Sequence, residues 1–284
     1  MKRVAEVLGV SRSNLYEKRL GYCDQSRGSY DKRADEELLP LIREIVDERP
    51  TYGYPRTTAV LNRRLRATGR GAVNRKRVYR IMKRNGFLLQ RYGRGPTRRH
   101  NGLIMTSESN QRWCSDIFEI PCWNGEVVRV AFAMDCCDRE VMSYLASTSG
   151  ISGEMIRDLI VEVIESRFGE VDRVPHRIEW LSDNGAAYTA EQTRTFAASV
   201  GLVACTTPKE SPESNRMAES FVKTFKRDYV WVHRLDNAQV VMEQLPGWFR
   251  DYNENHPHSS LKMMSPREYV QSLTNLQECP VLWG

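Results

Sequence analysis

The chain has 284 residues, of which 40% are hydrophobic and 27% are charged, and its formal net charge is +6 at pH 7. This length fits about two folded domains, and aromatic residues spread along most of the chain exclude intrinsic disorder. No run of roughly 18 apolar residues is present, which excludes a transmembrane helix. The first residues also lack the apolar core of a secretory signal, so we expect a cytoplasmic protein with no membrane contact.

The seven cysteines are odd in number and show no C-x-x-C pair. They predict free, mostly buried thiols and neither a disulfide scaffold nor a structural zinc. The adjacent Cys136 and Cys137 are too close for easy bridging and receive no role. His256 and His258 flank a proline without a cysteine partner, so packing or a phosphate contact is favoured over metal ligation.

Charge is unevenly distributed along the chain. Residues 1–100 contain 25 Lys and Arg against 10 Asp and Glu, whereas the remainder contains 17 and 26. Between Glu48 and Glu108 there are 16 basic residues and no acidic one. An all-positive stretch of this length indicates a polyanionic partner, and we expect double-stranded DNA.

The first residues, 1–34, are predicted to form a short helix-turn-helix-like segment and a linker. Residues 35–89 follow as a basic, all-helical DNA-binding domain, and 90–107 as a basic linker that could track phosphates. Apolar periodicity predicts three helices in this domain: about 35–48, Pro55 to about Ala67, and a third from an Asn74 cap to Gly86.

The third of these helices has one apolar and one basic face. Val78, Ile81 and Met82 are expected to face inward. The residues expected to contact DNA are Arg75, Lys76, Arg80, Lys83 and Arg84. A basic face on the last helix of a small helical unit is typical of a helix-turn-helix module in a major groove; the alternative is a solvated surface helix.

From residue 108 to 272 the pattern changes to alternating strands and helices. Three strands precede an alternation of helices and strands, which is the order of an α/β ribonuclease-H-like core with a mixed five-stranded sheet. The expected elements are strands at 112–120, 127–134, 141–147, 177–182 and 202–206, and helices at 151–168, from a Thr189–Gln192 capping box to about 200, and at about 213–229.

The end of the chain contains weaker helical signals. Residues 236–253 are expected to be helical but interrupted at Pro246-Gly247. Ser265 and Glu268 form a capping box with Pro266 at the first helical position, which predicts a last short helix. Residues 273–284 are expected to be a C-terminal tail.

Three acidic residues stand out by their positions. Asp116 lies in the middle of the first predicted strand, Asp183 follows a short buried strand, and Glu219 lies on a long helix after 35 intervening residues. Each alone is compatible with a surface or turn position, but together they could converge on one metal site. Glu119 and Asp135 are interpreted as structural, because they lie on the opposite strand face and in a turn.

These residues carry a family resemblance. WCSD at Asp116, LSDNG at Asp183 and SPESNRMAES at Glu219 resemble the OrfB-type DDE transposases of bacterial insertion sequences, which have a retroviral-integrase-like catalytic core. PTYGYPR and NRKRVYRIMKRNG resemble the family's helix-turn-helix region, and YNENHPHSSL and SPREYV the end of its core.

The resemblance implies that Asp116, Asp183 and Glu219 are catalytic and hold two Mg²⁺ ions, for which Mn²⁺ can substitute. It also implies hydrolysis at the element's end followed by attack of the freed 3′-OH on a second phosphodiester. A homo-oligomer bridging two DNA ends and a companion OrfA protein are the implied partners.

Several basic residues near Glu219 are candidates for DNA contacts. Lys223 and Lys226 follow it at helical spacing on one face, and Lys226 matches a basic position of the family; the alternative is a solvated lysine. Asn215 is also expected to contact DNA. Arg216 departs from the family, where Gly commonly follows Asn, so it either contacts DNA or marks an inactivating change.

The sequence therefore predicts a DNA transposase that binds element ends and cuts and joins DNA. Two alternatives stay open: a DNA-binding remnant or repressor that has lost catalysis, and a ribonuclease-H-like nuclease that cuts without joining.

Overall fold

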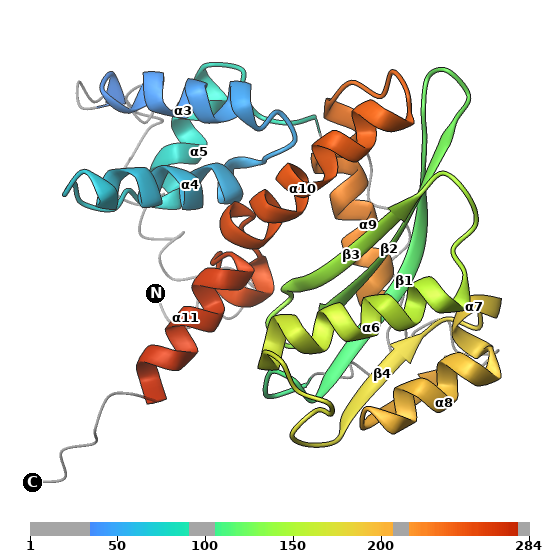
Figure 1. The fold of residues 1–284 in the computed structure, drawn as a ribbon. Coiled ribbons are helices and arrows are strands. Elements are labelled where there is room, and N and C mark those ends of the chain that lie inside the picture. The colour runs from blue at the N-terminus through green and yellow to red at the C-terminus, as the bar shows by residue number, and fades with distance from the viewer. Residues whose placement is uncertain (1–34, 91–105, 207–215, 278–284) are drawn as a thin grey trace, which may run out of the picture. The chain divides into compact units, whose positions relative to one another are not determined.

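The computed structural model of the chain describes residues 35–90, 106–206 and 216–277 (Figure 1). The chain divides into two compact units, Met1–Glu44 and Ile45–Gly284, and the boundary falls within helix α3 (Leu38–Glu48). The helical segment expected at 1–34, most of the basic linker and the end of the predicted tail lie outside the described residues. The predicted domain boundaries stay predictions.

Helices α4 (Tyr54–Ala67) and α5 (Arg75–Arg84) form where the sequence predicts them. Asn74 caps α5, because its side chain accepts a hydrogen bond from the backbone N–H of Lys76 at 2.8 Å. The Asn62 side chain bonds both backbone groups of Val73, at 2.7 and 3.1 Å, and so holds the loop before α5 against α4. The apolar face of α5 is buried as predicted.

A five-stranded sheet forms the centre of the second part of the chain. Its strand order is β3-β2-β1-β4-β5, with β1 antiparallel to β2 and parallel to β4. This mixed sheet confirms the predicted ribonuclease-H-like core. The strands are β1 (Arg112–Pro121), β2 (Val127–Asp135), β3 (Val141–Ser147), β4 (Ile178–Ser182) and β5 (Leu202–Thr206).

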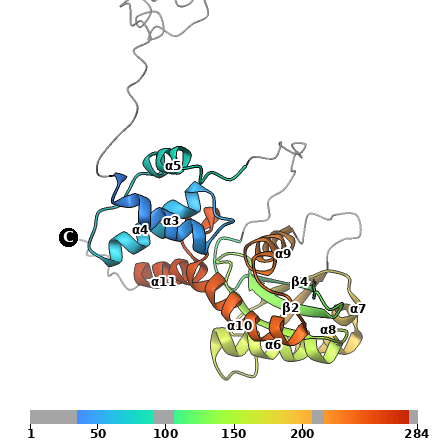
Figure 2. The same cartoon turned by 90° about the horizontal axis from the view of Figure 1, so that it is seen from above.

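Helices cover both faces of the sheet (Figures 1 and 2). On one face, α6 (Gly153–Phe168) buries an apolar stripe with α7 (Ala186–Thr189) and α8 (Glu191–Ser199). On the other face, α9 (Arg216–Asp228) and α10 (Ala238–Asn255) form a second apolar core with β1 and β2. Short 3₁₀ turns η2 (Val230–Val232) and η3 (Ser259–Leu261) follow α9 and α10.

Two local predictions are wrong. Helix α10 is continuous through Pro246; the missing backbone N–H costs about 3 kcal/mol, and the buried residues on either side, Leu245 and Trp248, hold the helix against the core. Thr189 does not cap α8, because it lies in α7 and its hydroxyl donates to the Gly185 carbonyl at 3.1 Å. Residue Ala190 precedes α8 without a side-chain cap.

The last predicted capping box is present. The Ser265 N–H donates to the Glu268 carboxylate at 2.7 Å, and the Glu268 N–H donates to the Ser265 hydroxyl at 3.2 Å. These reciprocal bonds begin α11 (Pro266–Gln277). Among the residues described, none of the helices is long and apolar enough to cross a membrane.

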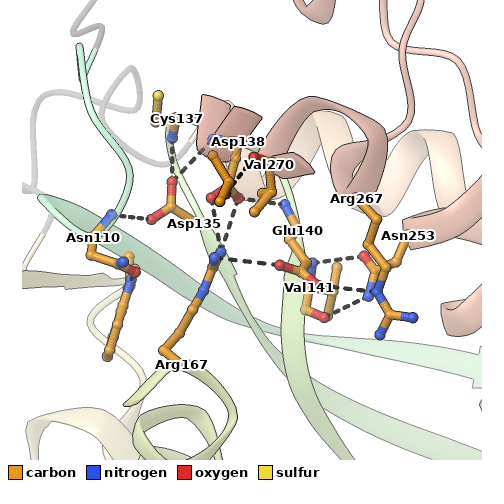
Figure 3. A network of polar contacts seen from close by, with 12 residues as sticks. Asn110, Asp135, Cys137, Asp138, Glu140, Val141, Arg167, Asn253, Arg267 and Val270 are labelled. Atoms are coloured by element: carbon orange, nitrogen blue, oxygen red, sulfur yellow. Dashed lines mark hydrogen bonds and ion pairs between the residues drawn. The ribbon is translucent and has the colours of Figure 1, made fainter. Parts of the chain in front are cut away.

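The turn between β2 and β3 is fixed by a buried polar network (Figure 3). Asp135 accepts hydrogen bonds from the backbone N–H groups of Asn110, Cys137 and Asp138 at 2.6 to 3.1 Å. Asp138, which is fully buried, forms an ion pair with Arg167 of α6 at 2.9 Å. The structural role predicted for Asp135 is therefore confirmed.

Candidate active site

The register of the central strands brings Asp116 and Asp183 to the same place. In the parallel pair β1 and β4, Cys114 lies opposite Leu181. Asp116 and Asp183 each follow by two residues, so the continued register sets them side by side, and neighbouring strands are about 4.8 Å apart. Asp116 lies in the middle of β1 and Asp183 directly follows β4, so the two carboxylates meet at the carboxyl end of β4, where ligand sites of α/β sheets gather.

The Asp116 carboxyl is half-buried, and its pKa is raised to about 6. Burial is the largest cause, because it disfavours the charged form. A hydrogen bond from the Ile117 N–H at 2.8 Å acts in the opposite direction. The negative charges of Asp183 and Glu219 raise the pKa further. The three predicted acids are thus close enough to repel one another.

Asp183 is oriented by a turn in which Gly185 lies close to its carboxylate. Its Oδ1 accepts a hydrogen bond from the Gly185 N–H at 3.0 Å. A Cβ at Gly185 would lie only 2.9 Å from that oxygen, which is closer than real contacts allow. The φ of Gly185 is −59°, which suits any residue, so a side chain here would act by pushing the Asp183 carboxylate aside. The LSDNG segment therefore fixes the direction of the Asp183 side chain.

Glu219 is positioned by the packing of α9 on the sheet. Phe221 contacts Phe132 of β2 with ring centroids 4.4 Å apart, and Phe225 contacts Phe118 of β1 at 5.7 Å. This packing buries one side of α9 and leaves Glu219 exposed, close enough to Asp116 for its charge to raise the pKa of that carboxyl.

The basic residues predicted beside Glu219 lie on its face of α9. The Lys223 amine is 3.8 Å from the Glu219 carboxylate. The Lys226 amine lies 5.7 Å from the ring centroid of Phe118, two residues from Asp116 along β1. The helix face predicted from the sequence is confirmed. Asn215 lies outside the described residues, whereas Arg216 is half-buried at the start of α9.

Tyr188 ties two parts of the site together and was missed by sequence reasoning. Its buried hydroxyl is 2.7 Å from the Ser115 hydroxyl, next to Asp116. Burial is the main cause that raises the pKa of Tyr188, and Asp116 and Asp183 add to it. The bond links α7, which follows Asp183, to β1. No local sequence signal marks this pair, because the two residues meet only in the folded sheet.

The described residues contain no group of three or more His, Cys, Asp or Glu side chains already gathered at metal-binding spacing. Asp116, Asp183 and Glu219 are close enough for mutual repulsion but are not drawn together as ligands. Glu119, the alternative acid on β1, pairs with Arg129 at 3.0 Å and is exposed. His256 is fully buried and its ring contacts those of Tyr52, Tyr252 and His258.

The basic face of α5 is exposed as predicted. The residues concerned are Arg75, Lys76, Arg80, Lys83 and Arg84. Three arginines of the all-positive stretch instead pair with acids from the end of the chain: Arg49 with Asp251 at 2.6 Å, Arg56 with Asp228 at 2.9 Å, and Arg63 with Glu268 at 2.6 Å.

Comparison with known proteins agrees with this architecture. Two integrase core domain families match residues 106–212 and 204–266, and an HTH-like domain matches residues 32–95. Transposase InsD for insertion element IS2A/D/F/H/I/K of Escherichia coli is 44% identical over 94% of this chain and 90% of its own length. Transposase InsD for insertion element IS2-9 of Escherichia coli (strain K12) is equally similar, over 88% of its length.

Among solved structures, the catalytic domain of Mos1 mariner transposase is 15% identical, covering 60% of this chain and 78% of that chain, with a TM-score of 0.43. That likeness adds nothing to the assignment. The mixed sheet and the matched domains define an integrase-core protein with a helix-turn-helix-like region. On the identity to InsD, the chain belongs to the family of insertion-element transposases.

Proposed function

We propose that this transposase cleaves DNA at the ends of its insertion element and joins the freed 3′-OH to a target phosphodiester, with Asp116, Asp183 and Glu219 as catalytic residues. The observation that carries the proposal is the electrostatic coupling of these carboxylates. Burial and the charges of Asp183 and Glu219, which are far from Asp116 in sequence, raise the pKa of Asp116. Clustered carboxylates with a shifted pKa are a feature of functional sites.

The donor set suits a divalent cation. Hard Mg²⁺ prefers carboxylate oxygens, and repulsion among three carboxylates is relieved by a bound cation. Glu219 is exposed and pairs only loosely with Lys223 at 3.8 Å, so its side chain can turn toward the two aspartates. Two such ions, Mg²⁺ or Mn²⁺, would activate the attacking oxygen and stabilise the leaving one.

The chain's own residues hold and orient the DNA in this proposal. Asp116 must lose its proton before it can bind a cation, which favours activity above pH 6. Lys223 and Lys226 lie on the Glu219 face of α9 and hold phosphate oxygens beside the site. The bond between Tyr188 and Ser115 keeps α7 and β1 in place. Water or a DNA 3′-OH can attack in the same geometry, so no covalent enzyme intermediate is needed.

DNA ends are recognised by the exposed basic face of α5, with Asn215 and Arg216 as additional contacts near the active site. Helix α5 has ten residues, and five of its six basic side chains are exposed, away from the buried stripe. We include in the proposal a homo-oligomer that bridges two ends and an OrfA companion, which the resemblance of the motifs to OrfB-type transposases implies.

Strand transfer with an oligonucleotide copy of the element's end tests the proposal. Asp116→Asn should bind the end but form no joined product in Mg²⁺. The matched control is Glu119→Gln, which changes an acid of the same strand that pairs with Arg129 outside the site; this variant should join normally.

Other outcomes would decide against the proposal. Joining by Asp116→Asn would remove Asp116 from the site. Cut but unjoined products from the unmodified protein would identify a nuclease, and binding with neither product would identify a DNA-binding protein without catalysis.

A further inference from the structure

A cavity of about 310 Å³ lies beside α9 and the 3₁₀ turn η3. It is formed by the start of α4, the turn after β2, one face of α9 and the segment after α10. None of the described residues that line it is acidic. Its charged and imidazole side chains are Arg56, Arg139, Arg216, His256 and His258, accompanied by the hydroxyls of Ser220, Thr224, Ser259 and Ser260.

Three buried nitrogen atoms of this lining have no hydrogen-bond partner within the described part of the chain: Nε of Arg139, Nε2 of His256 and Nε2 of His258. The His256 side chain is fully buried. Burying a polar group without a hydrogen-bond partner is unfavourable. Three such groups around one cavity indicate a ligand with several hydrogen-bond acceptors.

The protonation of the imidazoles makes them suitable donors. Burial lowers the pKa of His256 well below its ordinary value, and burial with Arg56 and Arg139 lowers that of His258 to about 3. Both rings are therefore neutral at pH 7, each with one N–H. The Tyr52 hydroxyl lies 3.1 Å from Nδ1 of His256, and when it donates there the ring proton lies on Nε2. Asp228 is 3.8 Å from Nδ1 on the same side of the ring and already pairs with Arg56.

Arg139 is held in place by the turn between β2 and β3. Its φ is +66°, a conformation that side-chain-bearing residues rarely adopt. The Asp135, Asp138 and Arg167 network fixes the residues on both sides of it (Figure 3). The turn therefore presents Arg139 to the cavity as part of a rigid structure.

The cavity and the proposed catalytic residues lie on different faces of α9. At 100° per residue, Glu219, Lys223 and Lys226 fall on one face, whereas the cavity residues Met217, Ser220, Phe221 and Thr224 fall on a face roughly 140° away. Arg216 lies between the two faces. A strand that passes over the amino-terminal end of α9 would therefore meet both places in succession.

We propose that this cavity binds a backbone phosphate of the DNA strand next to the reacting phosphodiester. The ligand class is a phosphate oxyanion, recognised by Arg139, Arg216 and the two imidazoles. This step rests on the proposed function, because DNA is the source of the phosphate.

The test is the affinity for a double-stranded oligonucleotide of the element's end, measured by fluorescence anisotropy in EDTA over a salt series. Arg139→Asn removes the cation and keeps a residue that tolerates positive φ. Affinity should fall about tenfold or more, and the slope of log affinity against log salt should fall by about 0.9. The matched control, Arg157→Gln, removes a charge from α6 on the opposite face of the sheet and should leave both nearly unchanged.

Thermal unfolding without DNA separates this role from a structural one. Arg139→Asn should melt at the same or a higher temperature, because it removes a buried nitrogen without a partner. If it melts lower, His258→Gln takes its place in the binding assay. Normal DNA affinity in a stably folded variant would overturn the proposal, since the cavity then holds only water.

Inorganic phosphate distinguishes the source of the ligand. If phosphate raises the melting temperature of the unmodified protein and Arg139→Asn abolishes this rise while DNA affinity is unchanged, the site takes a free anion and the DNA assignment is wrong. Metal-free binding is independent of catalysis, so loss of strand transfer in Asp116→Asn cannot mimic either result.

Discussion

Asp116 should reduce the stability of the metal-free protein at neutral pH, and Asp116→Asn should restore it. The carboxylate is half-buried and faces the negative charges of Asp183 and Glu219, which together with burial raise its pKa from 3.8 to about 6. A carboxyl whose pKa is higher in the folded state prefers to be protonated there. Its ionisation therefore opposes folding as the pH rises. Asparagine has nearly the same shape and no charge, so it removes this penalty.

The magnitude follows from the pKa shift. One pKa unit corresponds to about 1.4 kcal/mol, so ionised Asp116 costs the folded state up to about 3 kcal/mol at pH 8 and about 1 kcal/mol at pH 4.5. The penalty is absent below the unfolded pKa and complete above pH 6. Solvent reaches the half-buried carboxylate and reduces the gain, so we expect a stabilisation by Asp116→Asn of about 1–3 kcal/mol at pH 8.

The assay is denaturant unfolding of both proteins in EDTA at pH 4.5 and pH 8. The exposed Glu119→Gln variant is the control and should change stability by less than about 0.5 kcal/mol at either pH. An equal effect of Asp116→Asn at both pH values, or a destabilisation at pH 8, would refute the electrostatic argument. Added Mg²⁺ should stabilise the unmodified protein selectively, because a bound cation needs the ionised carboxylate.

Three further predictions concern the site and the basic helix. Gly185→Ala should lower strand transfer about 10–100-fold by displacing Asp183, and it should leave DNA affinity unchanged. The control is Gly150→Ala, where an added Cβ meets nothing within 4 Å, and this variant should be active. Tyr188→Phe should cost about 1 kcal/mol of stability through the lost bond to Ser115 and lower the turnover of strand transfer with DNA affinity unchanged. Lys83→Gln should reduce the salt slope of DNA binding by about 1, as measured by anisotropy, and leave the rate of joining of saturated DNA unaltered.

Much of the core could be predicted from the sequence. Residues of high strand propensity on either side of a tight turn predicted β2 and β3, and the position of Asp183 after a short buried strand placed it at the end of β4. The helical spacing from Glu219 to Lys226 gave the correct face of α9. These predictions succeed because strand propensity and helix periodicity are local properties of the chain.

Other features depend on contacts between distant segments. The parallel register that brings Asp116 beside Asp183 is set by pairing of β1 with β4, which no local pattern encodes. Pro246 stays inside α10 because burial against the core outweighs the lost hydrogen bond. The bond from Tyr188 to Ser115 likewise exists only in the folded sheet. In each case the observed structure is set by tertiary packing and not by the local conformational preference of the residue.

Three ion pairs join the start of the basic region to the last part of the chain. Substitutions in these two segments are therefore expected to depend on each other. Arg49, Arg56 and Arg63 each need a carboxylate contributed from beyond residue 227. Among related transposases, residues at the two ends of each pair should change together. A chimera that takes its basic helices from one relative and its core from another will keep this junction only if all three pairs are transferred as matched sets. Changes of DNA specificity by exchange of segments are therefore expected to begin after Arg63, within the part of the chain that carries α5.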